Sequence, residues 1–392
     1  NNTVAIGGVV SATNSVGIGY RALYSNTSGS QNTAVGFEAA KANTSGNDIT
    51  AVGRQALWKN TSGSGNTGIG HIALYSNTSG NYNTAVGKWG LFLNTTGDYN
   101  TSLGHATLAA TSGSHTGDQN TAIGSRSMLY NNSGSANTAL GFESLQTNKG
   151  GNHSVAIGYK SMFYANNSSS SFTTYNTAIG YEALRGSTTA ANNTGTKNTA
   201  IGYQSMQNNT SGQDNTATGY TALLANTTGV SNTGYGAFSL KANTTGDQSV
   251  AIGFNSLKAN TTGSSNTAIG SNALYTNSSG NENTAVGIET LYENTTGIGN
   301  SATGYQALFS NTTGEENTAV GFKSIRANTT GEANTGIGLN ALITNTTGSD
   351  NTGIGAGADV GASNLTNATA IGHGAIVSAS NKIRLGDGNV TS

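Results

Sequence analysis

The 392-residue chain lacks cysteine and proline altogether and carries few charges. Without cysteine, disulfides cannot stabilise the fold, and the chain says nothing about a redox compartment. Charged residues make up 8% of the chain and the net charge is −1, so the basic stripe of a nucleic-acid-binding protein is absent. No apolar run approaches the roughly 18 residues that a membrane-spanning helix needs. We therefore expect no nucleic-acid partner and no membrane insertion of this segment.

What the chain has in abundance is one repeat. A glycine at the end of an Ala-Ile-Gly or Ala-Val-Gly step recurs from Gly7 to Gly372, and 17 of the 21 intervals are 17 residues long. Self-similarity at a fixed period predicts a repeat architecture. The apolar positions stay in phase, which argues against disorder despite 57 glycines and little charge. Positions below are counted from this repeat glycine as position 0.

The departures from the period divide the chain. Residues 1–18 are a degenerate first coil, and residues 19–355 form a shaft of 17-residue repeats. Insertions interrupt the shaft at 105–119, 168–175 and 186–197. Residues 356–392 form a divergent terminal coil that reads as a cap or neck approach. No signal peptide opens the chain, which starts inside a repeat, so we expect a processed segment of a longer product.

One repeat predicts strands and turns. Position −1 is Ile or Val, position −2 is Ala or Gly, position +1 is often aromatic, and position +4 is Leu or Met. An N-T-[S/T]-G turn begins at position +7. Seventeen residues are too few for a crossover through a helix. The pattern predicts an all-β, parallel β-solenoid of about 22 coils, each with two short strands and two turns, stacked about 4.8 Å apart.

So thin a solenoid cannot bury all of its apolar side chains. Either the Ile/Val–Tyr/Phe face or the Leu face would stay exposed, and an exposed apolar stripe predicts an interface. Several identical rods packed around a shared axis would cover it. The small residue at −2 and the glycine at 0 allow neighbouring backbones to approach closely. Asparagine columns such as Asn32, Asn66, Asn83 and Asn100 are expected to stack as amide ladders.

The repeat resembles the head repeats of trimeric autotransporter adhesins, with S-V-A-I-G at Ser154–Gly158 and Ser249–Gly253 as the nearest instances. It also looks like the repeats of phage and bacterial tail-fibre proteins. The resemblance covers nearly the whole chain and implies a left-handed parallel β-roll, trimeric, acting as a surface adhesin or fibre. The repeat here is 17 residues long, whereas the family repeat is about 14 or 15.

No arrangement of residues points to catalysis, and we expect no enzyme and no cofactor. His105, His115 and Asp118 share the first insertion, where a metal site is the alternative to a solvated loop. His71, His105 and His373 occupy position +1, where an ion on a trimer axis is the alternative to ordinary packing. No Ser/His/Asp set has a recognisable spacing.

The asparagine of each N-T-[S/T]-G turn also heads an N-x-[S/T] sequon. It is therefore either a turn residue or, where the machinery exists, an N-glycosylation site. The candidates are Asn26, Asn43, Asn60, Asn77, Asn94, Asn209, Asn226, Asn243, Asn260, Asn294, Asn311, Asn328 and Asn345.

Aromatic residues recur at position +5 and alternate there with Lys and Arg, which predicts half-exposed side chains. They either pack along the edge of the roll or stack on sugar rings, and packing is the interpretation we favour. The candidates are Tyr24, Trp58, Tyr75, Phe92, Phe163, Tyr275, Tyr292 and Phe309. Insertions in a solenoid map to loops on one face, often the binding face, so the three insertions are the candidates for receptor contact.

The sequence thus predicts an extracellular protein, at a cell surface or on a virion, that forms the shaft or head of a fibre or adhesin. Its partners would be further copies of itself and a host-surface glycan or protein receptor. One alternative is a subunit of a head-to-tail filament, because coil ends carry unpaired strand edges. Another is an ice-binding solenoid, which needs a flat array of Thr on strands. Against it, the Thr columns are expected in or beside turns.

Overall fold

The structure is a computed structural model that describes residues 4–6, 14–110 and 113–388. Parts of the predicted first coil, first insertion and terminal region lie outside the described residues. The chain is an all-β parallel β-solenoid of about 22 turns with a spacing of about 17 residues, which confirms the predicted fold class. Among the described residues the one helical element is the 3₁₀ turn η1 (Ala190–Asn192), and no helix could span a membrane. The chain divides into two compact units, residues 1–198 and 199–392, which are described separately.

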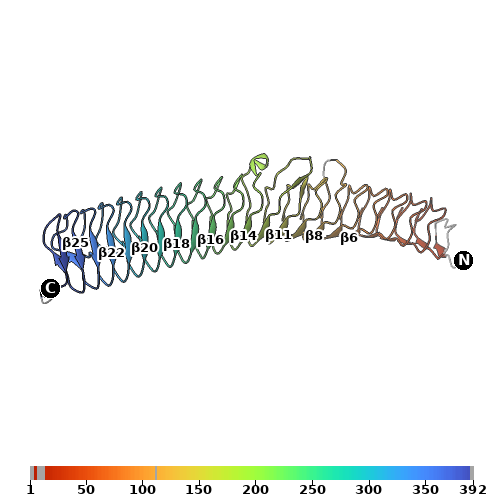
Figure 1. Ribbon diagram of the computed structural model, residues 1–392. Helices are drawn as coiled ribbons and strands as arrows, with labels where there is room; N and C mark the ends of the chain where they lie inside the picture. Colours follow the sequence, from red (N-terminus) through yellow and green to blue (C-terminus); the bar gives the residue numbers. More distant parts are fainter. Residues whose placement is uncertain (1–3, 7–13, 111–112, 389–392) are drawn as a thin grey trace. The chain divides into compact units, whose positions relative to one another are not determined.

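In the first unit, most turns contribute one three-residue strand that pairs in parallel with the strands of neighbouring turns (Figure 1). The register places each repeat position beside itself, so that Thr33 pairs with Thr50 and Val35 with Val52. A separate small sheet pairs β10 (Gly151–Asn152) with β12 (Phe172–Thr173). The main-sheet strands are β1 (Val4–Ile6), β2 (Val16–Ile18), β3 (Thr33–Val35), β4 (Thr50–Val52), β5 (Thr67–Ile69), β6 (Thr84–Val86), β7 (Thr101–Leu103), β8 (Thr121–Ile123), β9 (Thr138–Leu140), β11 (Val155–Ile157) and β13 (Thr177–Ile179).

The second unit repeats this plan with more regular spacing. Its terminal turns add a small second sheet, β24 (Asp359–Val360) with β26 (Ile376–Val377). The main-sheet strands are β14 (Thr199–Ile201), β15 (Thr216–Thr218), β16 (Thr233–Tyr235), β17 (Val250–Ile252), β18 (Thr267–Ile269), β19 (Thr284–Val286), β20 (Ser301–Thr303), β21 (Thr318–Val320), β22 (Thr335–Ile337), β23 (Thr352–Ile354), β25 (Thr369–Ile371) and β27 (Ile383–Leu385).

The expectation of two strands in each coil is wrong for most turns, and the backbone at positions +2 and +4 explains why. Gln55 and Leu57 have φ values of 54° and 51°, in the left-handed region, whereas a strand needs successive extended residues. Ala56 and Leu57 are both buried, although neighbouring residues of a strand would point to opposite faces. Hydrogen bonds still join the turns here, because Leu57 N–H donates to the Ala73 carbonyl at 2.9 Å.

The core is a thin column of small and medium side chains. The middle residue of each strand, at position −2, points inward, and Ala51 is fully buried there. The leucine at position +4 packs against the residue at position −2 of the next turn. A Cβ built on Gly68, which holds position −2, would lie 3.3 Å from Leu57 Cγ. Of the two apolar faces weighed from the sequence, the Leu face is therefore the buried one.

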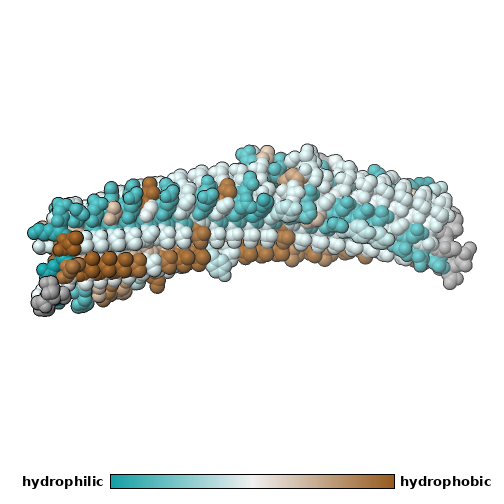
Figure 2. All heavy atoms as spheres, in the orientation of Figure 1, coloured by the Kyte–Doolittle hydropathy of each residue, from teal (hydrophilic) through white to brown (hydrophobic). Residues whose placement is uncertain are grey.

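The Ile/Val–Tyr/Phe face is the exposed one. The last residue of each strand, at position −1, points outward, and Ile69, Ile252 and Ile269 are each 39% exposed. The aromatic residue at position +1 is more exposed still, with Tyr20 at 55%. Figure 2 shows hydrophobic side chains as brown bands along the sheet side of the solenoid. We call these two columns the apolar face.

The repeat glycine allows turns to approach closely, as its position predicts. Gly36 has a φ of 138°, which L-residues rarely adopt. A Cβ added at Gly36 would lie only 2.5 Å from the carbonyl oxygen of Gly53 in the next turn. A side chain at this position would push adjacent turns apart.

The predicted asparagine ladder is present at position −4. Asn83 Nδ2 donates to Asn66 Oδ1 at 3.2 Å, and Asn100 Nδ2 donates to Asn83 Oδ1 at 3.1 Å. Each amide also binds backbone, as when Asn83 Nδ2 donates to the Gly97 carbonyl at 2.7 Å. These side chains are fully buried. The ladder therefore satisfies polar groups that so thin a core could not otherwise bury.

Replacing one ladder residue, Asn300→Ala, should destabilise the second unit by about 2 kcal/mol or more, because buried partners lose their hydrogen bonds. Asn300 Oδ1 accepts from the N–H and from Nδ2 of Asn317, both at 3.1 Å, and Asn300 Nδ2 donates to the Gly314 carbonyl at 2.8 Å. Circular dichroism during thermal unfolding would measure the loss. Hydrogen exchange should show the Asn317 amide losing its protection.

The matched control is Thr296→Ala, at an exposed position of the neighbouring turn. Equal stability of the Asn300 and Thr296 variants would show that the ladder contributes nothing.

Candidate functional site

The sequon asparagines form a second ladder inside the solenoid. All 13 are at most 4% exposed. Asn43 Nδ2 donates to the Gly46 carbonyl at 3.0 Å, which closes the turn, and to Asn26 Oδ1 at 3.1 Å in the preceding coil. Asn60, Asn77 and Asn94 continue the series with Nδ2 to Oδ1 distances of 2.9, 2.7 and 2.7 Å. A glycan on one of these nitrogens would have to replace a hydrogen bond in the interior, so the geometry fits the turn interpretation.

The position +5 aromatics stack on one another. In the first unit Trp58 lies 5.1 Å from Tyr75, and Tyr75 lies 5.5 Å from Phe92, between ring centroids. In the second unit Tyr275, Tyr292 and Phe309 stack at 5.0 and 5.1 Å. These rings are half-buried, so their faces are taken up mainly by their neighbours.

Cations cover three of the four ends of these ring stacks, and the Phe92 end is the exception. Lys41 Nζ lies 5.4 Å from the Trp58 ring centroid, Lys258 Nζ lies 5.1 Å from that of Tyr275, and the Arg326 guanidinium carbon lies 5.2 Å from that of Phe309. The two remaining candidates stand outside the stacks. Tyr24 is 52% exposed beside Arg21, and Phe163 meets Tyr164 edge-on at 4.5 Å. The geometry of the stacks fits the packing interpretation.

The three insertions bulge from one edge of the first unit, away from its main-sheet strands (Figure 1). Segment 168–175 contributes β12, and segment 186–197 contains η1. Contacts tie these loops to the body of the unit: Ser133 Oγ donates to the Ser169 carbonyl at 3.1 Å, and Asn193 Nδ2 donates to the Tyr164 carbonyl. The insertions are thus held on one side, where the solenoid offers a non-repeating surface.

The first insertion buries a histidine where the second ladder is interrupted. His115 pairs with Asn94 through backbone bridges and is completely buried. Its Nδ1–H donates to the Asn131 carbonyl at 3.0 Å. His115 Nε2 and Asn94 Oδ1 have no hydrogen-bond partner among the described residues. Burial lowers the pKa of His115 from 6.5 to about 4, so the ring is neutral near pH 7.

The histidines and acids of that insertion do not converge. His105 lies at the surface and stacks on Trp89 at 5.6 Å, whereas His115 is inside. Asp118 is exposed and accepts a hydrogen bond from Asp98 N–H at 2.8 Å. Within the described part of the chain, no three His, Cys, Asp or Glu residues are placed to hold a metal ion. His71 and His373 belong to different units, and an axial ion between copies stays a prediction.

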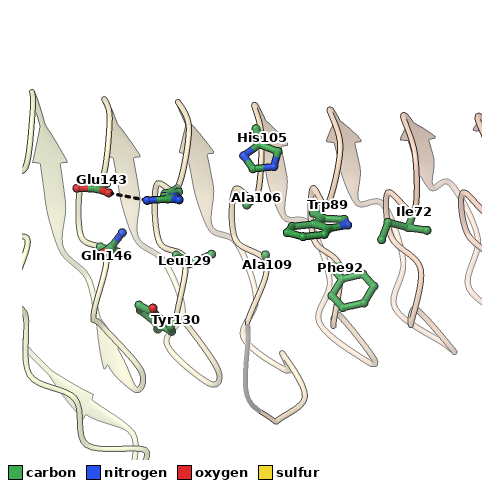
Figure 3. A pocket seen from close by; sticks show the side chains of 11 residues that line it. Ile72, Trp89, Phe92, His105, Ala106, Ala109, Leu129, Tyr130, Glu143 and Gln146 are labelled. Atoms are coloured by element: carbon green, nitrogen blue, oxygen red, sulfur yellow. Dashed lines mark hydrogen bonds and ion pairs between the residues drawn. The ribbon is translucent and has the colours of Figure 1, made fainter.

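The same stretch carries a surface hollow of about 530 Å³, which we call the Ala109 hollow (Figure 3). Its floor is the buried cluster of Ala106, Ala109 and Leu129. Trp89 and Phe92 stand on one side of the floor, and Glu143 and Gln146 stand on the other (Figure 3). His105 and Arg126 also line the hollow. The sequence had singled out only Phe92 and His105 among these residues. The one sequence feature that could have indicated the hollow is the presence of alanine at both position +2 and position +5 of the same turn, Ala106 and Ala109.

The burial of His115 makes stability depend on pH. Between about pH 4 and 6.5 the unfolded chain binds a proton at this histidine that the folded chain does not, so stability falls as the pH falls through that window. We expect His115 to account for a loss of about 2 kcal/mol on going from pH 7 to pH 5. Thermal unfolding of the native chain and of His115→Asn, at both pH values, isolates this contribution. An equal loss in both chains would contradict it.

No protein-family model matches the chain, and no curated protein matches it in sequence.

Proposed function

We propose that the chain is the shaft or head of an extracellular fibre, at a cell surface or on a virion, that attaches or scaffolds without catalysis. It assembles as a homotrimer of left-handed β-rolls, as the adhesin and tail-fibre repeats that it resembles imply. The observation that carries this proposal is the apolar face. It runs along both units, and no other part of the described chain covers it.

Two kinds of apolar column lie side by side on that face. Aliphatic side chains at position −1 form the first, which continues through nearly every turn. Aromatic rings at position +1 form the second, in runs that are interrupted between Phe37 and Phe142, where Arg54, Lys88 and Ser125 are among the residues at this position. These rings stack along the solenoid, with Tyr159 and Tyr181 5.1 Å apart in the first unit and Tyr203 and Tyr220 5.1 Å apart in the second. Soluble monomers rarely expose a contiguous apolar patch larger than a few hundred Å². A stripe repeated turn after turn therefore favours burial against another copy.

Parallel copies suit this stripe because the aliphatic residue at position −1 recurs in register in nearly every turn. In a closed ring, the −1 column of one copy packs against the +1 column of the next, and each copy uses both columns. The number of copies in the ring, three, is what the family resemblance implies. A rigid fibre of identical turns then presents the same surface several times, and weak single contacts add up to firm attachment.

Analytical ultracentrifugation should give a mass of about three times the 39.3 kDa chain. The double variant Ile252→Asp/Ile269→Asp should dissociate to a folded monomer, because it places charges in the face without emptying the core. Thr262→Asp/Ser279→Asp, on exposed turn positions of the same unit, is the control and should remain assembled.

A stable monomer at all concentrations would refute the homotrimer. A polymer of indefinite length would instead favour the filament alternative.

One feature of the strands favours the ice-binding alternative. Thr at position −3 lies on a strand in most turns, so the expectation that the Thr columns lie in or beside turns is wrong for this column. From β3 to β9 the first strand residue is Thr in every turn, in register and facing outward beside the −1 column. Val155 interrupts the array in the first unit, and Val250 and Ser301 interrupt it in the second.

If the fibre proposal holds, a solution of the pure protein should show no thermal hysteresis, the gap between melting and freezing points that ice-binding proteins produce. Hysteresis that disappears in Thr67→Leu/Thr84→Leu and survives in the turn variant Thr61→Leu/Thr96→Leu would move the conclusion to ice binding. Nanolitre osmometry measures both.

A further inference from the structure

We propose that the Ala109 hollow binds a single sugar ring, the pyranose unit of a surface polysaccharide. The inference rests on the proposed function, since it names the chemical class of receptor that the fibre would hold. It begins from an interruption in the ring stack at position +5. Trp58, Tyr75 and Phe92 follow one another at ring distances of 5.1 and 5.5 Å, and the next turn supplies Ala109 instead of a ring.

The neighbouring column is interrupted in the same turn. Trp89 occupies position +2 and is followed there by Ala106, where Gln, Glu or Arg stands in many other turns. Both alanines are almost completely buried and form the floor. With two adjacent side chains missing, the face of Phe92 that would have met the next ring borders a hollow of about 530 Å³. Trp89 lines the hollow beside Phe92 and stacks on His105 at 5.6 Å. That volume falls within the roughly 300–1,000 Å³ of small-molecule sites.

The polar groups around the floor are available to a ligand. Gln146 is 7% exposed, and its side-chain amide makes no hydrogen bond within the described chain although it lines the hollow (Figure 3). The amide atoms of Gln146 are not enclosed by the protein, so they reach the space of the hollow and are open to a ligand. The Trp89 indole N–H is likewise unpaired among the described residues, whereas Trp58 Nε1 donates to Glu38 at 3.1 Å.

Charged groups complete the rim. Arg126 Nη1 lies 3.3 Å from Glu143 Oε1, and the Arg126 side chain is 52% exposed, so its other N–H groups are free to face solvent. Lys160 Nζ lies 3.6 Å from Glu143 Oε2 and holds that carboxylate in place. The rim therefore offers both donors and acceptors within one small space, which suits a ligand rich in hydroxyl groups.

A sugar fits this asymmetry better than a flat aromatic ring does. The Trp89 and Phe92 rings stand on one side of the hollow, tilted by 36° to each other. Because His105 stacks on Trp89, the Phe92 ring is the apolar surface that one face of a ligand would meet. The opposite side is polar. A pyranose has a face of C–H groups to lie on the rings and a rim of hydroxyls for Gln146 and Arg126. An aromatic ring would make few hydrogen bonds with those polar groups, whereas the hydroxyls of a sugar would replace the water around them.

Tryptophan fluorescence tests the inference directly. The chain has two tryptophans, so Trp58→Phe leaves Trp89 as the sole reporter, and Phe is a residue that the +5 column already uses. The probes are methyl glycosides of hexoses, N-acetylhexosamines and uronic acids, titrated to about 10 mM because single weak sites bind near millimolar concentrations. At least one probe should change the Trp89 emission saturably.

Two variants on this background decide whether the hollow is responsible. Ala109→Phe restores the missing ring and should weaken binding at least 10-fold by filling the space. Gln146→Leu should weaken it about 10-fold by removing the amide. Ile343→Phe adds a ring at position +5 of the second unit and should leave the affinity unchanged. Circular dichroism of each variant checks that it is folded.

Three outcomes would overturn the inference. The first is no saturable change with any glycoside, and the second is binding that persists in Ala109→Phe. The third is tighter binding of indole or tyrosine amide than of every sugar, which would assign the hollow to an aromatic side chain of a protein. Analytical ultracentrifugation of the same samples tests the proposed assembly independently of sugar binding. A trimer that binds no sugar contradicts only the inference, whereas a monomer that binds sugar contradicts only the assembly.

Discussion

The structure depends on hydrogen bonding between identical positions of adjacent turns. Each turn is too short to enclose a core of its own, so stability comes from stacking on its neighbours. Two asparagine ladders run inside each unit, one at position −4 and one at position +7. The hydrogen bonds of these ladders hold the interior together in place of large apolar side chains, which so narrow a solenoid cannot accommodate. The glycine that ends each N-T-[S/T]-G turn follows from the same constraint: a Cβ at Gly46 would lie 2.6 Å from Asn43 Oδ1 and 2.4 Å from the Gly63 carbonyl.

The period made the solenoid, its number of turns, the close approach at the repeat glycine and the first ladder predictable, because stacking places each residue beside its own copy. Conformation within a turn was harder. Leu57 in the left-handed region carries no sequence signal, since leucine seldom adopts it, and so the second strand was expected where none forms. The Ala109 hollow could not be predicted for another reason. Predicting it requires knowing that the side chains at positions +2 and +5 lie on the same surface, and only the path of the backbone shows this.

Several features that distinguish one turn from the next gather around the first insertion. The first insertion brings the buried His115, the end of the ring stack and the Ala109 hollow into one stretch of the first unit. The regular turns supply the apolar face and the ladders, which are suited to assembly and length. This distribution of features agrees with the proposed fibre, in which the regular turns would assemble with other copies and the irregular turns would contact a receptor.

Stacking in register also explains why the chain has so little charge. Any residue type that recurs at one position meets itself about 4.8 Å away in the next turn, so a recurrent acid or base would repel its own copy along the whole column. Threonine, asparagine and aromatic residues gain from such self-contact, because they hydrogen-bond or stack between turns, and alanine is small enough to pack against its copy. A gene that lengthens by duplicating a 17-residue unit therefore copies only residues that tolerate themselves, and the reach of the solenoid can be adjusted one turn at a time without any new contact having to evolve.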